Sequence, residues 1–143
     1  MEVVIQEEET GCGLACVAML AGESYEAVRR TAAGMGIRAT DEALWSDTAY
    51  VRRLLRHYGI ETRPGEAPFT GWAELPARAL LATKLHYDRG RPFWHWVVFV
   101  REPEGPVVLD PAPYLAGNRR TDTEAITPAW FIPIPTARVP EPG

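Results

Sequence analysis

The 143-residue chain is poor in several residue types that carry chemistry. It contains two cysteines, two serines, three histidines, one lysine and one glutamine. Two cysteines are too few for a disulfide scaffold, and Cys12 and Cys16 stand four apart on an expected helix, where disulfide geometry is poor. We therefore expect two free thiols and a reducing compartment. Both serines, Ser24 and Ser46, are expected to cap helices, which argues against a serine hydrolase.

Long hydrophobic runs and an excess of positive charge are also absent. The best apolar run, residues 14–21, is far short of the roughly 20 residues that cross a membrane. It follows an acidic segment rather than the basic start of a signal peptide. A net charge of -4 and a pI near 5.4 argue against a nucleic-acid binder. We expect no membrane segment, no nucleic-acid partner and a cytoplasmic location, with export as an effector through an unrecognised signal as the alternative.

The residue pattern changes from helical to strand-like at about Pro76. Before it, helices are expected over residues 11–21, over 24–33, and from a cap at Ser46 or Asp47 to about residue 58. A short strand is expected at 60–63 and a helical turn at 70–75. After it, strands are expected over 79–86, 93–101, 107–110 and 130–134.

This order of elements predicts an α+β fold, with N-terminal helices packed on a C-terminal antiparallel sheet. The first helix is apolar on all sides and should be buried. The strand at 93–101 is apolar on both faces and should be central and covered on both sides. The length fits one domain over residues 1–143, with a proline-rich tail from about residue 135.

Cys12 opens the first helix and is the candidate nucleophile. Unpaired backbone N–H groups and the helix dipole stabilise a thiolate at that position, which is the reactive form of cysteine. The same N–H groups can stabilise an oxyanion, and Gly11 and Gly13 are expected to leave the backbone open to a substrate. The alternative is a small buried cysteine, which is our interpretation of Cys16.

His95 and Asp110 form the second candidate group. His95 lies in an apolar run, residues 93–99 (FWHWVVF), and needs hydrogen-bond partners there. A hairpin turn within 101–106 would pair this strand with 107–110, and an odd register sum would put Asp110 on the face of His95. Asp110 would then orient one ring nitrogen and leave the other for Cys12, as in acyl transfer. The alternatives are a hydrogen-bonded core histidine and an aspartate in an Asp-Pro turn.

Gln6 is the third candidate, six residues before Cys12. Its amide could donate to the same oxyanion, or it could be an ordinary polar residue in a polar segment. Cys12, Cys16, His86 and His95 do not have the usual spacing of a zinc site, so no metal is expected. The sequence contains no nucleotide-binding or H-E-x-x-H motif.

Taken together, these residues resemble a papain-like cysteine peptidase, and more narrowly the C39 peptidase family. That family includes the bacteriocin-processing domains of ABC exporters and standalone relatives. The resemblance lies in Gln6, residues 12–20 (CGLACVAML), 95–99 (HWVVF) and 109–111 (LDP), and spans about residues 5–112. It implies a compact papain-like fold in which Cys12 is the nucleophile, His95 the general base, Asp110 its orienter and Gln6 the oxyanion donor.

The chain departs from the exporter-linked members at Gly11, where they carry an acidic residue. No membrane or ATPase region follows, so we do not expect a complete exporter, and specificity for double-glycine leader peptides is not carried over.

We therefore expect a standalone cysteine peptidase that hydrolyses a peptide or isopeptide bond through a thioester on Cys12. Its substrate would be a peptide or protein, and it would need no cofactor. One alternative is a catalytically inactive papain-like domain that binds a peptide or partner protein in its cleft. Another is an effector- or toxin-type acyl transferase that uses the same site. An activating or immunity protein is the further partner to consider.

Overall fold

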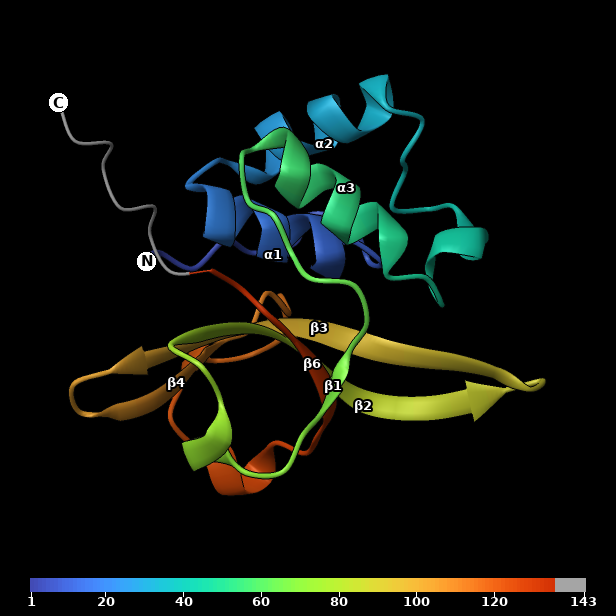
Figure 1. Cartoon of the computed structure of the whole chain (residues 1–143). Coiled ribbons are helices and arrows are strands. Elements are labelled where there is room, and N and C mark those ends of the chain that lie inside the picture. Colours follow the sequence, from blue (N-terminus) through green and yellow to red (C-terminus); the bar gives the residue numbers. More distant parts are fainter. Residues whose placement is uncertain (136–143) are drawn as a thin grey trace, which may run out of the picture.

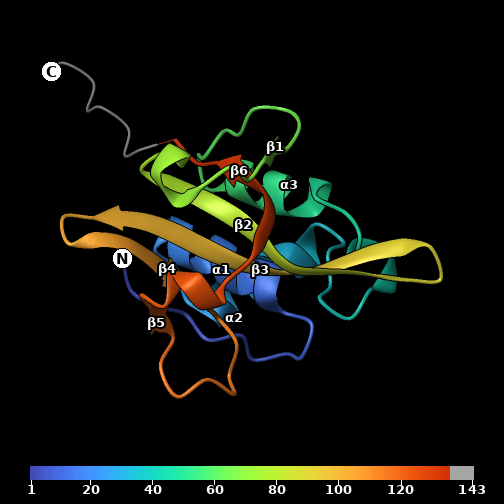
Figure 2. The same ribbon diagram turned by 90° about the horizontal axis from the view of Figure 1, so that it is seen from below.

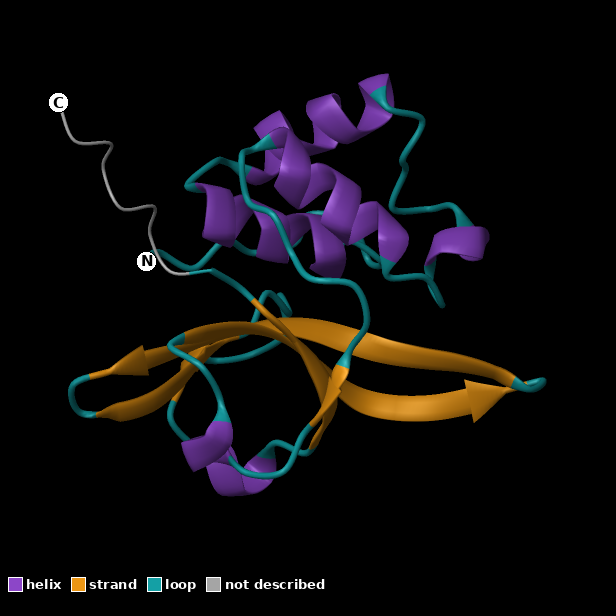
Figure 3. Cartoon of the chain, in the orientation of Figure 1, coloured by secondary structure: helices purple, strands orange, loops and turns teal. Residues whose placement is uncertain are grey.

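The computed structural model describes residues 1–135 of the chain. Three helices, α1 (Cys12–Ala21), α2 (Tyr25–Gly34) and α3 (Ala49–His57), form a layer over one face of a six-stranded antiparallel sheet (Figures 1 and 3). The sheet has the strand order β1-β6-β2-β3-β4-β5. The predicted α+β architecture is confirmed at this level, and most of the proline-rich tail expected from about residue 135 lies outside the described residues.

The strands form as the pattern after Pro76 predicts, with two additions. They are β1 (Ala67–Pro68), β2 (Arg78–Asp88), β3 (Arg91–Glu102), β4 (Gly105–Leu109), β5 (Arg119–Arg120) and β6 (Pro128–Pro133). The two unpredicted strands, β1 and β5, have two residues each, which is too short for any period to show. Three short 3-10 helices, η1 (Glu42–Leu44), η2 (Trp72–Glu74) and η3 (Thr123–Ala125), complete the described elements; η2 is the predicted turn.

The strand predicted at residues 60–63 is wrong. This segment is a connection after α3, and the guanidinium of Arg52 donates to the carbonyls of Arg63 and Gly65. Both predicted helix starts have a side-chain acceptor. Ser24 caps α2 by accepting from the Ala27 N–H at 3.1 Å. Of the two candidates for α3, Asp47 accepts from the Ala49 N–H at 2.9 Å, while Thr48, directly before the helix, makes no side-chain capping bond.

The α1 helix lies at the centre of the helical layer, as its composition predicts. Eight of its ten residues, from Gly13 to Leu20, are buried. The helix packs against α2, α3 and β3, and these neighbours shield it from water. A second core lies on the opposite face of the sheet, between the sheet and the η2 and η3 segments. It includes Leu81, Val97 and Phe99. The central strand β3 is therefore covered on both faces, as predicted.

Beyond the helices, β2 and β3 continue as a two-stranded arm over residues 84–95 (Figure 2). The register shifts between Thr83 and His86, where Lys84 adopts a left-handed φ of 56°. Two hydrogen bonds tie the arm to the segment around η1. Ser46 Oγ donates to the Pro92 carbonyl at 2.7 Å, and Arg91 Nη2 donates to the Glu42 carbonyl at 2.9 Å. Ser46 thus holds the arm and is not the cap of α3.

Candidate active site

Cys12 is the first residue of α1, directly after the N-cap residue Gly11. The first helical hydrogen bond runs from the Ala15 N–H to the Gly11 carbonyl at 3.0 Å, so the Cys12 N–H has no acceptor within the helix. The thiol is free and half-buried. A nucleophile at this position has unpaired backbone donors beside it, which is the local geometry that the sequence predicts.

The glycines on either side of Cys12 serve another purpose than the one predicted. A Cβ at Gly11 would collide with the Tyr25 hydroxyl, and a Cβ at Gly13 would collide with the Tyr50 hydroxyl. The expectation that these glycines leave open space for a substrate is therefore wrong. They make room for two buried tyrosines that pack against the start of the helix.

His95 and Asp110 meet as the register argument predicts. Val98 pairs with Leu109, which is an odd register sum, and Asp110 directly follows β4. His95 Nε2 donates to Asp110 Oδ1 at 2.7 Å. The side chains are 15% and 2% exposed, respectively, so this ion pair is largely shielded from water. The other ring nitrogen, Nδ1, is left for Cys12.

The protonated form of His95 is favoured at this site. Burial disfavours the charged ring, but the hydrogen bond with Asp110, the neighbouring Cys12 side chain and the negative charge on these groups outweigh it. Together these effects raise the pKa of His95 to about 9. A cationic imidazole that pairs with a carboxylate and lines the same pocket as a thiol is the arrangement that activates a cysteine.

Asp110 is held as a carboxylate by several donors. Its Oδ1 also accepts from the Ala112 N–H, and its Oδ2 accepts from Arg120 Nη1 at 3.1 Å. Burial opposes ionisation, but the bonds from His95, Ala112 and Arg120 prevail and lower the pKa of Asp110. Asn118 fixes the surrounding loop by donating to the Asp110 and Ala112 carbonyls at 2.7 Å each.

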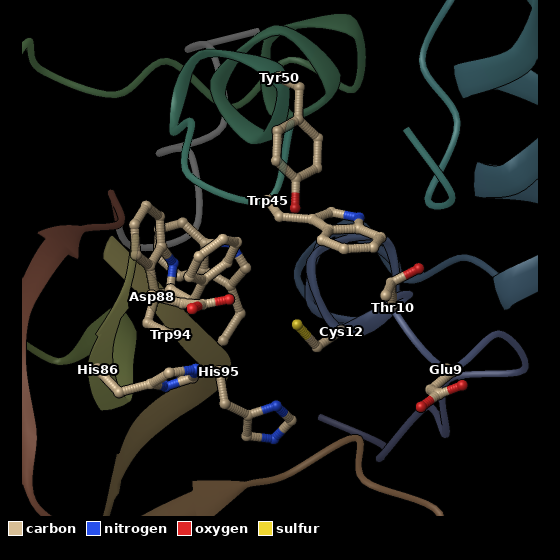
Figure 4. Close-up of a pocket in the computed structure, with 11 residues that line it drawn as sticks. Glu9, Thr10, Cys12, Trp45, Tyr50, His86, Asp88, Trp94 and His95 are labelled. Carbon is tan, nitrogen blue, oxygen red and sulfur yellow. The ribbon is translucent and has the colours of Figure 1, made fainter. Parts of the chain in front are cut away.

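Cys12 and His95 line one pocket of about 510 Å³. Figure 4 shows the sulfur and the imidazole facing into it, with Trp45 and the Tyr50 hydroxyl on the far side of the sulfur. Most of its wall is aromatic, and its residues come from the start of α1, from the η1 to α3 segment and from the β2–β3 arm: Glu9, Thr10, Cys12, Trp45, Tyr50, His86, Asp88, Phe93, Trp94, His95 and Trp96. The arm and the segment it ties down therefore build most of the pocket.

Gln6 is not brought into this pocket. Its side chain is 7% exposed, and Nε2 donates to the Glu8 carbonyl at 3.1 Å and to the Glu9 carbonyl at 2.7 Å. Its Oε1 is the one buried side-chain polar atom within residues 1–135 that has no hydrogen-bond partner. The amide braces the loop that leads to Cys12, and it would have to leave both carbonyls before it could donate to an oxyanion.

Three residues of the site were not found by sequence reasoning. Arg120 pairs with Asp110 across an irregular loop, so no spacing rule connects them. Tyr50 and Trp45 enter the pocket from a segment that looks like an ordinary amphipathic helix and its preceding turn. The close approach of the Tyr50 hydroxyl to Gly13 depends on packing, and sequence spacing cannot show it. Cys16, by contrast, is fully buried as expected, and burial raises the pKa of its thiol.

Comparisons with protein families, curated proteins and solved structures find no match for this chain. Within residues 1–135, no group of three or more histidine, cysteine, aspartate or glutamate side chains is placed to hold a metal ion. The same part of the chain contains no helix with the length and apolar character needed to cross a membrane.

Proposed function

We propose that this protein is a papain-like cysteine peptidase, similar to the C39 family, that hydrolyses a peptide or isopeptide bond through a thioester on Cys12. One observation carries the proposal: Cys12, His95 and Asp110 converge from α1, β3 and the end of β4, with the His95–Asp110 bond at 2.7 Å. A thiol, an imidazole and a carboxylate in this order form a nucleophile, a base and an orienter.

The first half of the reaction forms an acyl-enzyme. The Cys12 thiolate attacks the carbonyl carbon, and the carbonyl oxygen becomes an oxyanion beside the free Cys12 N–H. As the C–N bond breaks, His95 Nδ1 donates its proton to the leaving amine. The products of this half are a thioester on Cys12, the released amine and a neutral imidazole.

The second half returns the enzyme to its starting state. The neutral His95 accepts a proton from water, and the resulting hydroxide attacks the thioester carbon. The tetrahedral intermediate expels the Cys12 thiolate and releases the carboxylic acid. Asp110 stays ionised throughout because Arg120 and the Ala112 N–H stabilise its carboxylate, so it can orient the imidazolium in both halves.

The pocket supports a peptide substrate. Aromatic walls supply apolar contact area for side chains, and the 510 Å³ volume gives room for a short segment of chain. The thiol is half-buried at one side of this space, within reach of a bound carbonyl group.

The experiment is a search for new peptide termini. A library of peptides from a digested proteome is incubated with the full chain and, in parallel, with Cys12→Ala and His95→Ala. We expect new N-termini with the parent protein and none with either variant. Cleavage that persists in Cys12→Ala would contradict the proposal. Peptides that bind without being cut by any of the three proteins would favour the inactive binding domain.

A further inference from the structure

Two buried tyrosines flank the candidate nucleophile. Tyr25 packs its hydroxyl against Gly11, and Tyr50 packs its hydroxyl against Gly13. The residues are similarly buried, at 2% and 7% exposed. They differ in whether the hydroxyl group has a hydrogen-bond acceptor, and this difference points to a role for one of them.

The Tyr25 hydrogen is already used. Its hydroxyl donates to Glu8 Oε1 at 2.6 Å, on the side of the helix start that faces α2. This bond fixes the loop before Cys12. Tyr25 does not line the pocket, so a bound substrate would not replace Glu8 as the acceptor.

The Tyr50 hydrogen has no such acceptor. Within residues 1–135, the structure gives the Tyr50 hydroxyl no protein group to donate to, and the residue lines the pocket with Cys12. Its polar neighbour is the Trp96 indole N–H. An indole N–H can only donate, so this neighbour cannot accept the hydroxyl hydrogen.

Tyr50 also stays protonated. Burial and the nearby Cys12 thiolate raise the pKa of Tyr50 well above its ordinary value, and the Trp96 N–H offsets only part of this. The hydroxyl is therefore a donor throughout the pH range in which His95 is charged.

We propose that Tyr50 is a catalytic residue whose hydroxyl donates a hydrogen bond to the oxyanion that forms when Cys12 attacks a carbonyl. It would act together with the Cys12 N–H, in the role that the sequence suggested for Gln6. The amide hydrogens of Gln6 are occupied by the Glu8 and Glu9 carbonyls, whereas Tyr50 needs no rearrangement to donate. The inference rests on the proposed acyl-transfer function of Cys12.

An activated ester tests this step separately from leaving-group protonation. With p-nitrophenyl acetate, the Cys12 thiolate attacks the acetyl carbon and the oxyanion forms. The C–O bond then breaks, leaving an acetyl thioester and p-nitrophenolate, which needs no proton from His95. Iodoacetamide supplies the matched reference, because its alkylation of the same thiolate displaces iodide and forms no oxyanion.

We expect Tyr50→Phe to slow the acylation burst by roughly 10²–10³-fold and to leave the iodoacetamide rate near that of the parent protein. Tyr25→Phe, the matched control, should leave both rates near the parent values. Cys12→Ala gives the background from other acetylated groups.

Three outcomes would overturn the assignment. Acylation that is equally fast in Tyr50→Phe would show that the hydroxyl does not stabilise the oxyanion. An equal loss of both rates would mean that Tyr50 only positions the thiol. If the parent protein acylates no faster than Cys12→Ala, the proposed function itself fails, and this inference fails with it.

Discussion

The carboxylate of Asp110 receives His95 Nε2 on one oxygen, at 2.7 Å, and Arg120 Nη1 on the other, at 3.1 Å. His95 lies 15 residues before Asp110 in the chain, and the pair forms because β3 and β4 are joined by a tight hairpin with an odd register sum. A one-residue slip of this hairpin would put the two side chains on opposite faces of the sheet.

Cys12 should be alkylated rapidly at acidic pH. His95 keeps its charge up to a pKa of about 9 and stabilises a thiolate beside it. In a Cys16→Ala background, iodoacetamide should therefore react fast at about pH 5–6, where an ordinary thiol with a pKa of ~8.5 is almost fully protonated. The measurement is the rate against pH by intact mass. Adding His95→Ala should abolish the acidic reactivity, and a profile indifferent to His95 would mean that the pair does not form.

Asp110→Asn should lower the rate of acyl transfer by roughly 10²–10⁴-fold. Asparagine keeps the size of the side chain but removes the charge that orients and stabilises the imidazolium. The pH profile of Cys12 alkylation should also lose its acidic plateau. Asp122→Asn is the control, because Asp122 pairs with the same Arg120 at 2.8 Å but does not contact His95. Equal effects of the two variants would argue against a special role for Asp110.

Arg120→Gln should shift the acidic limb of the pH–rate profile to higher pH. Arg120 is one of the groups that lower the pKa of Asp110, so its removal lets that pKa rise and Asp110 protonates earlier as the pH falls. Arg119→Gln is the neighbouring control, because Arg119 pairs with Glu102. A profile of Arg120→Gln that overlays the parent profile would show that Arg120 has no electrostatic effect on the site.

The free energy of unfolding should decrease between neutral and alkaline pH because of His95. Its folded-state pKa of about 9 lies above the ordinary value of 6.5, so protonation favours the folded protein. This stabilisation is complete below about pH 6.5 and is lost as the pH rises through about 9, with an upper limit of about 3 kcal/mol. Urea unfolding at both ends of this range measures it. His95→Gln should flatten the dependence; the same slope in that variant would assign it to other groups.

Gly13→Ala should destabilise the protein by about 1–3 kcal/mol, because the new methyl group collides with the Tyr50 hydroxyl. Tyr50→Phe removes the oxygen that is struck, so the double variant should recover part of the loss. Thermal unfolding of the two single variants and the double variant gives the coupling between the two sites. Gly117→Ala is the control, since a Cβ there meets no atom within 4 Å. Additive effects of the two substitutions would contradict the packing described here.

Much of the fold follows from local patterns in the chain. Ser24 and the residues after it specify α2, because a serine side chain satisfies a free N–H at a helix start. The apolar composition of α1 predicts its burial, and the two-sided apolar pattern of β3 predicts its central place in the sheet. The segment at residues 60–63 shows the limit of this reasoning. Its apolar start, Ile60, donates its N–H to the Leu55 carbonyl of α3 at 2.9 Å and pairs with no neighbouring strand among the described residues.

The candidate site divides in the same way. The sequence by itself determined that a cysteine opens the buried helix, that a histidine lies on one strand of a hairpin, and that an aspartate lies at the end of the other strand. These are properties of short segments, set by helix-end chemistry and strand alternation. Only the tertiary structure decided that Arg120 supports Asp110, that Gln6 braces a loop, and that Tyr50 fills the space above Gly13. The contacts of Arg120 and Tyr50 join separate elements of the fold, whereas Gln6 bonds to Glu8 and Glu9 nearby in the chain. In each case side-chain packing, which has no sequence period, sets the contact.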